Sequence, residues 1–230
     1  MRSSAVFEDA NRLALAGLIP FSATDWPGKL TATVFTQGCP LRCAYCHNAQ
    51  LQEFPVMGGN ERAAGEERPT FSDALELMAQ RRSMLDGLVI SGGEPLAAAG
   101  LPAAIAATKS ACFPVGLHTS GYAPARLHAL LAQDETRPDW IGLDVKAIPR
   151  HAAAVTGLVA RAAERMWDSL RVATSTAKEH GVQLQMRTTL WPGSVIEEHL
   201  EELQAEVAKL GYELHLQWAR NVDEAGRYVA

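Results

Sequence analysis

Residues 38–48 read Gly38-Cys39-Pro40-Leu41-Arg42-Cys43-Ala44-Tyr45-Cys46-His47-Asn48, and they hold three of the four cysteines of the chain. The three thiols follow the spacing C-x3-C-x2-C. A disulfide uses two cysteines and leaves the third free, and a closed structural zinc site needs four ligands. Thiolates are also the usual ligands of iron–sulfur clusters, in which four irons ordinarily take four cysteines. Three cysteines on one loop therefore indicate a metal centre with one position open to an external ligand.

A zinc loop is compatible with the same spacing. It would be completed by His47 or by a distant residue. His47 directly follows Cys46, which is an awkward position from which to close the same tetrahedron. The cysteine spacing alone leaves both possibilities open.

The composition is that of an ordinary globular protein. Of the 230 residues, 47% are hydrophobic and 20% charged, with a formal net charge of −5. A chain of this length can form one α/β barrel domain, and the acidic balance gives no reason to expect nucleic-acid binding. No apolar run approaches the roughly 20 residues of a membrane span, and the acidic start is a poor signal peptide. We expect a cytoplasmic protein that binds neither nucleic acid nor membrane.

Short apolar stretches alternate with amphipathic ones along most of the chain. They predict a short edge strand at 17–21, further strands at 30–36, 86–91, 115–120, 140–147, 182–190 and 212–218, and helices at 71–84, 101–110, 124–131, 159–180 and 194–209. Six β/α units imply a parallel sheet with right-handed crossovers, curled into a partial (β/α)6 barrel that is open laterally. We expect 1–14 to be an N-terminal extension, 15–230 a single domain, and 52–69 a surface loop, with a lid as the alternative.

One face of several predicted strands carries polar side chains, while the alternate residues are apolar. These polar residues are His118, Asp144, Lys146, Arg187, His215 and Gln217. Burying such groups without partners would cost on the order of 1–3 kcal/mol each. We therefore expect this face to line a lumen that holds a polar ligand.

Each polar residue has a structural alternative. Asp144 and Lys146 lie near the carboxyl end of their strand, where α/β folds bind ligands. They suit a zwitterionic amino acid moiety or form an ion pair with each other. Arg187 suits a carboxylate or a salt bridge within the lumen. We expect His118 and His215 to be hydrogen-bonded imidazoles in the interior.

Gly92-Gly93-Glu94 follows the strand predicted at 86–91. Two glycines let a ligand approach the backbone closely, although Glu94 can also be no more than a turn residue. The fourth cysteine, Cys112, is expected to be a small buried hydrophobe.

The cysteine loop, the Gly-Gly-Glu sequence and Asp144-x-Lys146 together resemble the motifs of the radical S-adenosylmethionine (SAM) enzymes. The resemblance implies that Cys39, Cys43 and Cys46 are the catalytic residues and the ligands of a [4Fe–4S] cluster, whose fourth iron is chelated by SAM. The resemblance and the polar face together give the cofactor-binding candidates Tyr45, Gly92, Gly93, Glu94, Thr119, Ser120, Asp144, Lys146 and Arg187.

Further motifs at 19–22, 25–28, 37–40 and 46–48 resemble those of the proteins that activate anaerobic ribonucleoside-triphosphate reductase, a branch of the glycyl-radical activating enzymes. The similarity covers roughly residues 15–220. It implies an oxidoreductase that cleaves SAM reductively and generates a glycyl radical on a partner reductase, with a flavodoxin- or ferredoxin-like electron donor. Substrate-contact candidates are Asp25 by this resemblance, and His118, His215 and Gln217 on the polar face.

The chain departs from this branch at three positions. Ala49 stands where Pro is common, and Trp191 stands where a His commonly precedes the proline. His118 replaces an Asp that pyruvate formate-lyase activators associate with a cation site. The departures give no support for that cation site here, nor for a SAM-binding His at the end of the strand predicted at 182–190. Two alternatives stay open: a radical SAM enzyme for another target (a pyruvate formate-lyase-type enzyme or a small heterocycle such as a deazapurine precursor), and a non-catalytic zinc or iron–sulfur module.

Overall fold

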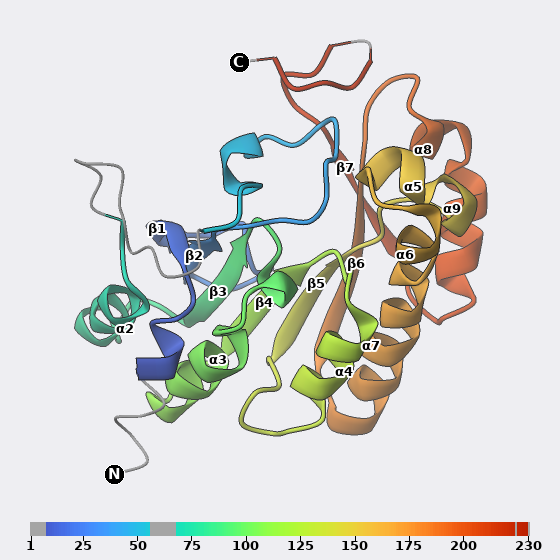
Figure 1. Cartoon of the computed structure of the whole chain (residues 1–230). Helices are drawn as coiled ribbons and strands as arrows, with labels where there is room; N and C mark the ends of the chain where they lie inside the picture. Colours follow the sequence, from blue (N-terminus) through green and yellow to red (C-terminus); the bar gives the residue numbers. More distant parts are fainter. Residues whose placement is uncertain (1–7, 56–67, 224, 230) are drawn as a thin grey trace.

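The computed structural model of the chain describes residues 8–55, 68–223 and 225–229. These residues form one seven-stranded sheet with the strand order β1-β2-β3-β4-β5-β6-β7, shown in Figure 1. Strand β1 runs antiparallel to β2, and every later neighbour is parallel. The strands are β1 Leu15–Ser22, β2 Thr31–Thr36, β3 Gly87–Gly92, β4 Val115–Thr119, β5 Trp140–Asp144, β6 Gln183–Leu190 and β7 Leu214–Trp218.

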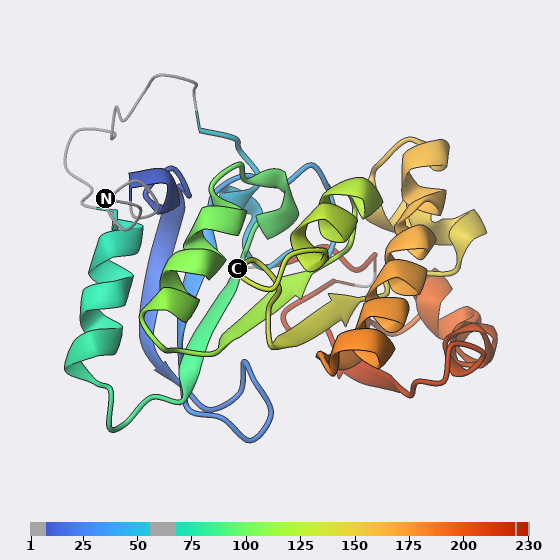
Figure 2. The ribbon, with the colours of Figure 1, turned by 90° about the horizontal axis from the view of Figure 1, so that it is seen from below.

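The helices gather on one face of the curved sheet, and Figure 2 shows this layer from below. They are α2 Phe71–Gln80, α3 Leu101–Ser110, α4 Pro124–Leu131, α5 Pro149–Thr156, α6 Ala160–Glu164, α7 Met166–His180, α8 Val195–Glu198 and α9 Leu200–Ala208, with short 3-10 helices η1 Ala49–Leu51 and η2 Pro95–Ala97. None of the helices in the described part of the chain has the length and apolar character needed to cross a membrane. The open, mostly parallel sheet with its layer of helices confirms the predicted α/β class and the lateral opening.

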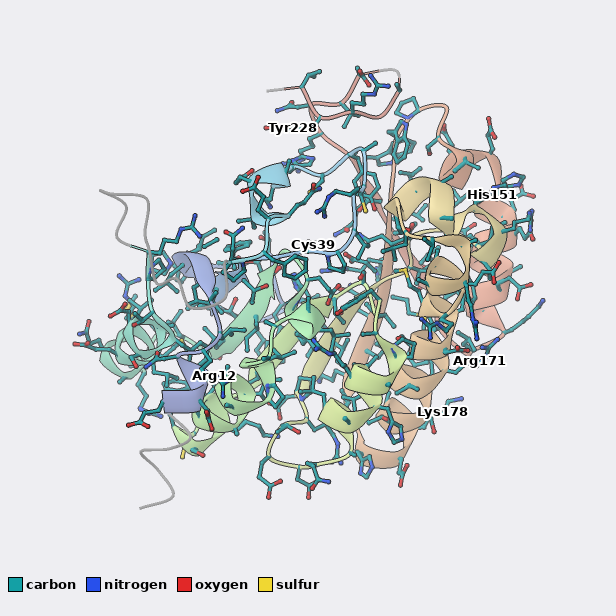
Figure 3. The ribbon with its side chains drawn as sticks, in the orientation of Figure 1. Arg12, Cys39, His151, Arg171, Lys178 and Tyr228 are labelled. Atoms are coloured by element: carbon teal, nitrogen blue, oxygen red, sulfur yellow. The ribbon has the colours of Figure 1, made fainter. Side chains whose placement is uncertain are left out.

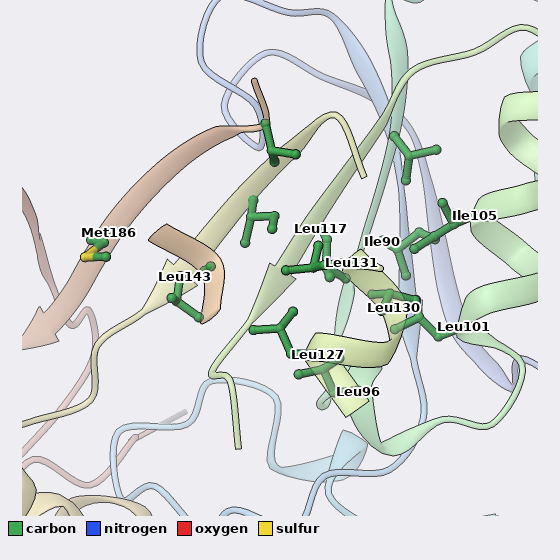
Figure 4. Close-up of a cluster of buried hydrophobic side chains, with 14 of the residues drawn as sticks. Ile90, Leu96, Leu101, Ile105, Leu117, Leu127, Leu130, Leu131, Leu143 and Met186 are labelled. Carbon is green, nitrogen blue, oxygen red and sulfur yellow. The ribbon is translucent and has the colours of Figure 1, made fainter. Parts of the chain in front are cut away.

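The main core lies between the sheet and this helix layer. It consists of aliphatic side chains on alternate strand positions and on the inner faces of the helices, among them Ile90, Leu117, Leu143, Ile105 and Leu127, as Figure 4 shows. Burial of such side chains contributes about 1.5–3 kcal/mol each before the entropy cost of ordering them. The opposite face of the sheet is the lumen.

A second, smaller apolar cluster closes the lumen at the amino end of the strands. Trp26, from the turn after β1, stacks on Trp140 with ring centroids 5.7 Å apart, and Val89 packs beside them. Gly116 makes room for both rings, because a Cβ there would come within 2.9 Å of Trp26 and 3.2 Å of Trp140. The prediction of a polar lumen is therefore wrong at this end, which is filled by aromatic side chains.

Several predicted boundaries are also wrong. Helix α5 was not predicted; it begins at Pro149 and ends at Thr156, and the following Gly157 caps it in a left-handed conformation. The helix predicted at 159–180 is split at Arg165 into α6 and α7, and the one predicted at 194–209 is split at His199. Strand β5 stops at Asp144, so Lys146 lies on the following loop and not within the strand.

Other predictions concern which residues are exposed to solvent. Cys112 is exposed, with a φ of 61°, and so it is not the buried hydrophobe that was predicted. The described part of the expected N-terminal extension, residues 8–14, reaches the core through Ala10 and Leu13, each 1% exposed. The expectation for the loop at 52–69 falls largely on residues 56–67, which lie outside the described residues.

Candidate cofactor site at the carboxyl end of the sheet

The cysteine loop leaves the carboxyl end of β2 and is held by backbone hydrogen bonds at several points. The amide of Gly38 donates to the carbonyl of Leu51 at 2.8 Å, and that of Cys39 donates to Gln52 at 3.2 Å. The buried side chain of Gln37 donates through Nε2 to the carbonyls of Gln50 and Glu53. The loop is thus shaped by its own backbone and by Gln37, which the sequence analysis did not single out as a site residue.

A cavity of about 150 Å³ lies beneath this loop, at the carboxyl ends of β3 to β6. The three cysteines line it together with every residue predicted to bind the cofactor: Tyr45, Gly92, Gly93, Glu94, Thr119, Ser120, Asp144, Lys146 and Arg187. His118 lines it as well, as do Ser91 and Gln52, which were not predicted. Asp25, His215 and Gln217 are not among the lining residues.

The donor set suits an iron–sulfur cluster. All three cysteines are free, and burial raises the pKa of the Cys39 thiol to about 12 and also that of Cys43. Deprotonated thiols in this pocket therefore need a compensating positive charge, which bound metal supplies. Within residues 8–55, 68–223 and 225–229, no three His, Cys, Asp or Glu side chains are placed to hold a single ion. A four-iron cluster binds each cysteine through a different iron, so that finding concerns single-ion sites only.

Gly92 and Gly93 join the end of β3 to the cysteine loop. The amide of Gly93 donates to Thr36 at 2.9 Å, and the amide of Glu94 donates to Gly38 at 2.9 Å. Gly92 has a φ of 119°, and a Cβ at Gly93 would collide with the Gly38 carbonyl. The close approach that requires these glycines is made by the backbone of the chain itself.

Glu94 is more than a turn residue. Its side chain is buried, and its two carboxylate oxygens accept four hydrogen bonds: from the Leu96 amide at 3.0 Å, the Thr119 hydroxyl at 2.5 Å, the Ser120 amide at 2.8 Å and the Ser120 hydroxyl at 2.5 Å. Burial raises the pKa of this carboxyl group, although the hydrogen bonds from Ser120 and Thr119 oppose the rise. Glu94 thus fastens the turn after β3 to the end of β4.

Asp144 pairs with both nearby cations. Arg187, its direct neighbour in the β5–β6 register, donates from Nε to Asp144 Oδ1 at 2.8 Å, and Lys146 Nζ lies 3.1 Å from Oδ2. Burial alone would raise the pKa of Asp144, but Arg187 and Lys146 hold it well below its usual range. The pKa of Lys146 is raised because Asp144 outweighs the effect of burial. The structural alternatives, an ion pair and a lumen salt bridge, are both present.

His118 is a hydrogen-bonded interior imidazole, as predicted. Its Nε2 lies 2.7 Å from the main-chain oxygen of Asp25, and its Nδ1 lies 3.2 Å from Ser91 Oγ. Burial and then the neighbouring Arg187 lower its pKa to about 4. A neutral ring that donates from Nε2 to Asp25 and accepts from Ser91 at Nδ1 satisfies these two contacts. Arg187 Nη1 also lies 3.3 Å from Nε2, and a ring N–H at Nε2 cannot accept a hydrogen bond from it.

His215 and Gln217 lie on the edge strand β7 and are exposed, so the prediction that His215 lies in the interior is wrong. Their register partners on β6 are Arg187 and Thr189, which places them on the lumen side at the open edge of the sheet. Asp25 lies deeper, where its carboxylate accepts a 2.6 Å hydrogen bond from the Thr33 hydroxyl. The structure therefore places Asp25 beside His118, whereas His215 and Gln217 lie at the exposed edge of the sheet.

Comparison with known proteins identifies the class. The model of the radical SAM superfamily matches residues 33–205, which span β2 to α9 and include the cysteine loop and every cavity residue described above. Solved structures share the fold: the TM-score is 0.55 to SuiB of Streptococcus suis (14% identity; 84% of this chain and 40% of that chain). It is also 0.55 to TYW1 with a lysine-pyruvate adduct bound (14% identity; 83% of this chain and 65% of that chain).

The chain therefore belongs to the radical SAM superfamily, and membership implies a [4Fe–4S] cluster and SAM as cofactors. A putative glycyl-radical enzyme activating enzyme, MJ1227 of Methanocaldococcus jannaschii, is 28% identical over 191 residues, 82% of this chain and 73% of that protein. A pyruvate formate-lyase-activating enzyme of Listeria monocytogenes is 38% identical over 72 residues, 31% of this chain and 27% of that enzyme. Of the solved structures, this chain covers 40% of the SuiB chain and 65% of the TYW1 chain, which is less than two thirds of each.

Proposed function

We propose that this radical SAM enzyme activates a glycyl-radical enzyme, and that its target is an anaerobic ribonucleoside-triphosphate reductase. The main support is that Cys39, Cys43 and Cys46 line the same cavity as the ion-paired side chains of Asp144, Lys146 and Arg187. The similarity to an activating enzyme over 82% of the chain supports the reaction class, and the motifs at 19–28 and 46–48 support the target.

When bound, the cluster and SAM supply a 5′-deoxyadenosyl radical through one-electron cleavage of the sulfonium, with the electron coming from a flavodoxin- or ferredoxin-like donor. The three cysteines are the residues that hold the cluster. Lys146 and Arg187 bring two positive charges against the one negative charge of Asp144. These three side chains together therefore carry one net positive charge, which can pair with a ligand carboxylate. The open edge of the sheet at β7 leaves the lumen accessible to a peptide segment of the partner.

A second target is favoured by one specific observation. The 38% identity over 72 residues is to a pyruvate formate-lyase-activating enzyme. A pyruvate formate-lyase-type glycyl-radical enzyme is accordingly the alternative substrate.

Anaerobic reconstitution tests the reaction class. The reconstituted chain is expected to bind four irons and to release 5′-deoxyadenosine from SAM when reduced with dithionite. A chain that binds zinc but no iron, or that leaves SAM intact, would contradict the proposal.

The target is tested by mixing the reduced enzyme with each partner separately. An EPR doublet of a glycyl radical should form on the ribonucleotide reductase and disappear when its radical glycine is replaced by alanine. A doublet on the formate-lyase-type partner only would establish the alternative target and reject the reductase.

A further inference from the structure

The last described segment of the chain returns to the cysteine loop. Residues 219–223 and 225–229, which we call the strap, follow β7 and fold back on themselves through a bridge between Val222 and Tyr228. Figure 1 shows the strap beside the loop between β2 and α2. None of the residues with a role in the proposed reaction belongs to the strap.

The strap contacts the turn that carries the third cysteine. The amide of Tyr228 donates to the carbonyl of Ala44 at 3.3 Å, and the ring of Tyr228 lies on that of His47, with centroids 4.9 Å apart. Ala44 lies two residues before Cys46 and His47 directly after it, and the amide of Cys46 closes the turn by donating to the carbonyl of Cys43 at 3.1 Å. Figure 3 shows Tyr228 on the strap, above the loop that holds Cys39.

A second contact runs through Trp191, which follows the end of β6. The buried Trp191 ring packs on Tyr45, with centroids 5.3 Å apart. Gly226 lies against the same indole ring so closely that an added Cβ would come within 2.1 Å of it, and its φ is 73°. Tyr45 is therefore held between the cavity and a tryptophan that the strap covers.

We propose that the strap is a positioning element for the cluster: Trp191, Gly226 and Tyr228 hold the Ala44–His47 turn and so fix Cys46 in the orientation in which it binds iron. Residues that orient metal ligands from behind commonly change metal affinity by about 10–100-fold when they are replaced. The proposal concerns cluster retention and does not depend on which partner the enzyme activates.

Gly226→Ala tests the proposal, with Gly211→Ala as its matched control. Both glycines have a positive φ, but an added Cβ at Gly211 meets nothing within 4 Å. The backbone strain is therefore shared, whereas only Gly226→Ala displaces the strap from Trp191. In reconstituted full-length enzyme kept anaerobic, iron transfer to a chelator should be about tenfold faster for Gly226→Ala than for Gly211→Ala.

A measurement on the cluster-free protein separates positioning from general instability. The exposed Cys112 serves as an internal reference thiol for limited labelling with iodoacetamide. The labelling rate of Cys46 relative to Cys112 should rise by about threefold in Gly226→Ala, because the turn opens locally more often, and should stay unchanged in Gly211→Ala. Equal labelling ratios and equal iron release in the two variants would overturn the proposal.

If Gly226→Ala does not fold, Tyr228→Ala against Val229→Ala provides the same comparison. Tyr228→Ala removes the ring contact with His47, whereas Val229 is half-exposed and has no contact with the cysteine turn among those described. Faster iron release in Tyr228→Ala only would support the proposal, and identical release in both variants would reject it.

Discussion

The two ends of the lumen are built in opposite ways. At the amino end of the strands, Trp26, Trp140 and Val89 are at most 4% exposed and pack on one another, with the edge of the His118 imidazole against Trp140. At the carboxyl end, the side chains of Lys146 and Asp144 are 12% and 24% exposed and pair with each other. Among the described residues, space and charge for a polar ligand are found together at the carboxyl end of the strands, whereas the amino end is closed by packed aromatic rings that contribute stability.

The largest expected effect is the loss of one cysteine from the open end. Cys43→Ala should lower 5′-deoxyadenosine formation by at least about 1,000-fold, because the cluster loses one of its three protein ligands. Iron per chain and product formation after anaerobic reconstitution check this. The control is Cys112→Ala, which alters an exposed thiol outside the cavity. Unchanged SAM cleavage in Cys43→Ala would show that the site is assigned wrongly.

Removing the shared carboxylate of the open end should have the next largest effect. Asp144→Asn leaves Lys146 and Arg187 without their common anion. The free energy of unfolding should fall by about 3 kcal/mol, the low end of the range for breaking a buried ion pair, because the Asp144 side chain is 24% exposed. Denaturant titration measures this. In the control, Asp168→Asn breaks an exposed pair with Arg171 and should cost less than about 0.5 kcal/mol. Equal losses in the two variants would mean that burial does not strengthen the Asp144 cluster.

The closed end can be broken by adding one methyl group. Gly116→Ala places a Cβ 2.9 Å from the Trp26 ring, and overpacking of this kind should lower the free energy of unfolding by about 2 kcal/mol. Gly17→Ala, also in a strand but with nothing within 4 Å of its added Cβ, should change it by less than about 1 kcal/mol. If Gly116→Ala left the free energy of unfolding unchanged, the cluster of Trp26, Trp140 and Val89 would be loosely packed.

The last effect concerns the pH dependence of stability, at His118 between the two ends. Its folded pKa of about 4 lies below the ordinary value of 6.5, so the unfolded chain takes up the proton first. Stability is then lost as the pH falls from about 6.5 to about 4, by at most about 1.4 kcal/mol per pH unit. Burial is the main cause of the lowered pKa and the Arg187 charge adds to it, whereas the main-chain oxygen of Asp25 and the charges of Asp144 and Asp25 oppose it.

His118→Gln should flatten this slope in unfolding titrations at pH 7, 6 and 5. His128→Gln, which alters an exposed histidine on α4, should leave it in place. A slope that persists without His118 would assign the acid sensitivity to another group.

The sequence predicted the carboxyl end of the lumen better than any other region. Its residues follow strands whose order is simple, and the carboxyl ends of neighbouring parallel strands meet at one edge. Cys39, Gly92, Thr119 and Asp144 therefore had to converge once the strands were located. The alternation of polar and apolar residues in β5 and β6 also located the lumen face correctly.

What the sequence did not reveal depends on contacts between distant segments. The Trp26–Trp140 stack joins residues 114 positions apart, and neither residue differs in type from an ordinary core residue. The exposure of His215 follows from the place of β7 at the edge of the sheet, which local alternation does not encode. Likewise, Pro149 gave no sign that a helix begins there, although proline is well suited to a first helical turn.

The backbone bonds of the cysteine loop have one more consequence. Gly38, Cys39 and Arg42 each donate an amide hydrogen bond to residues outside the stretch 38–48, namely Leu51, Gln52 and Thr156. The conformational entropy of this stretch is therefore already reduced when the chain folds. Assembly of the metal centre should then proceed in a folded apoprotein, so that loss of iron inactivates the enzyme without unfolding it.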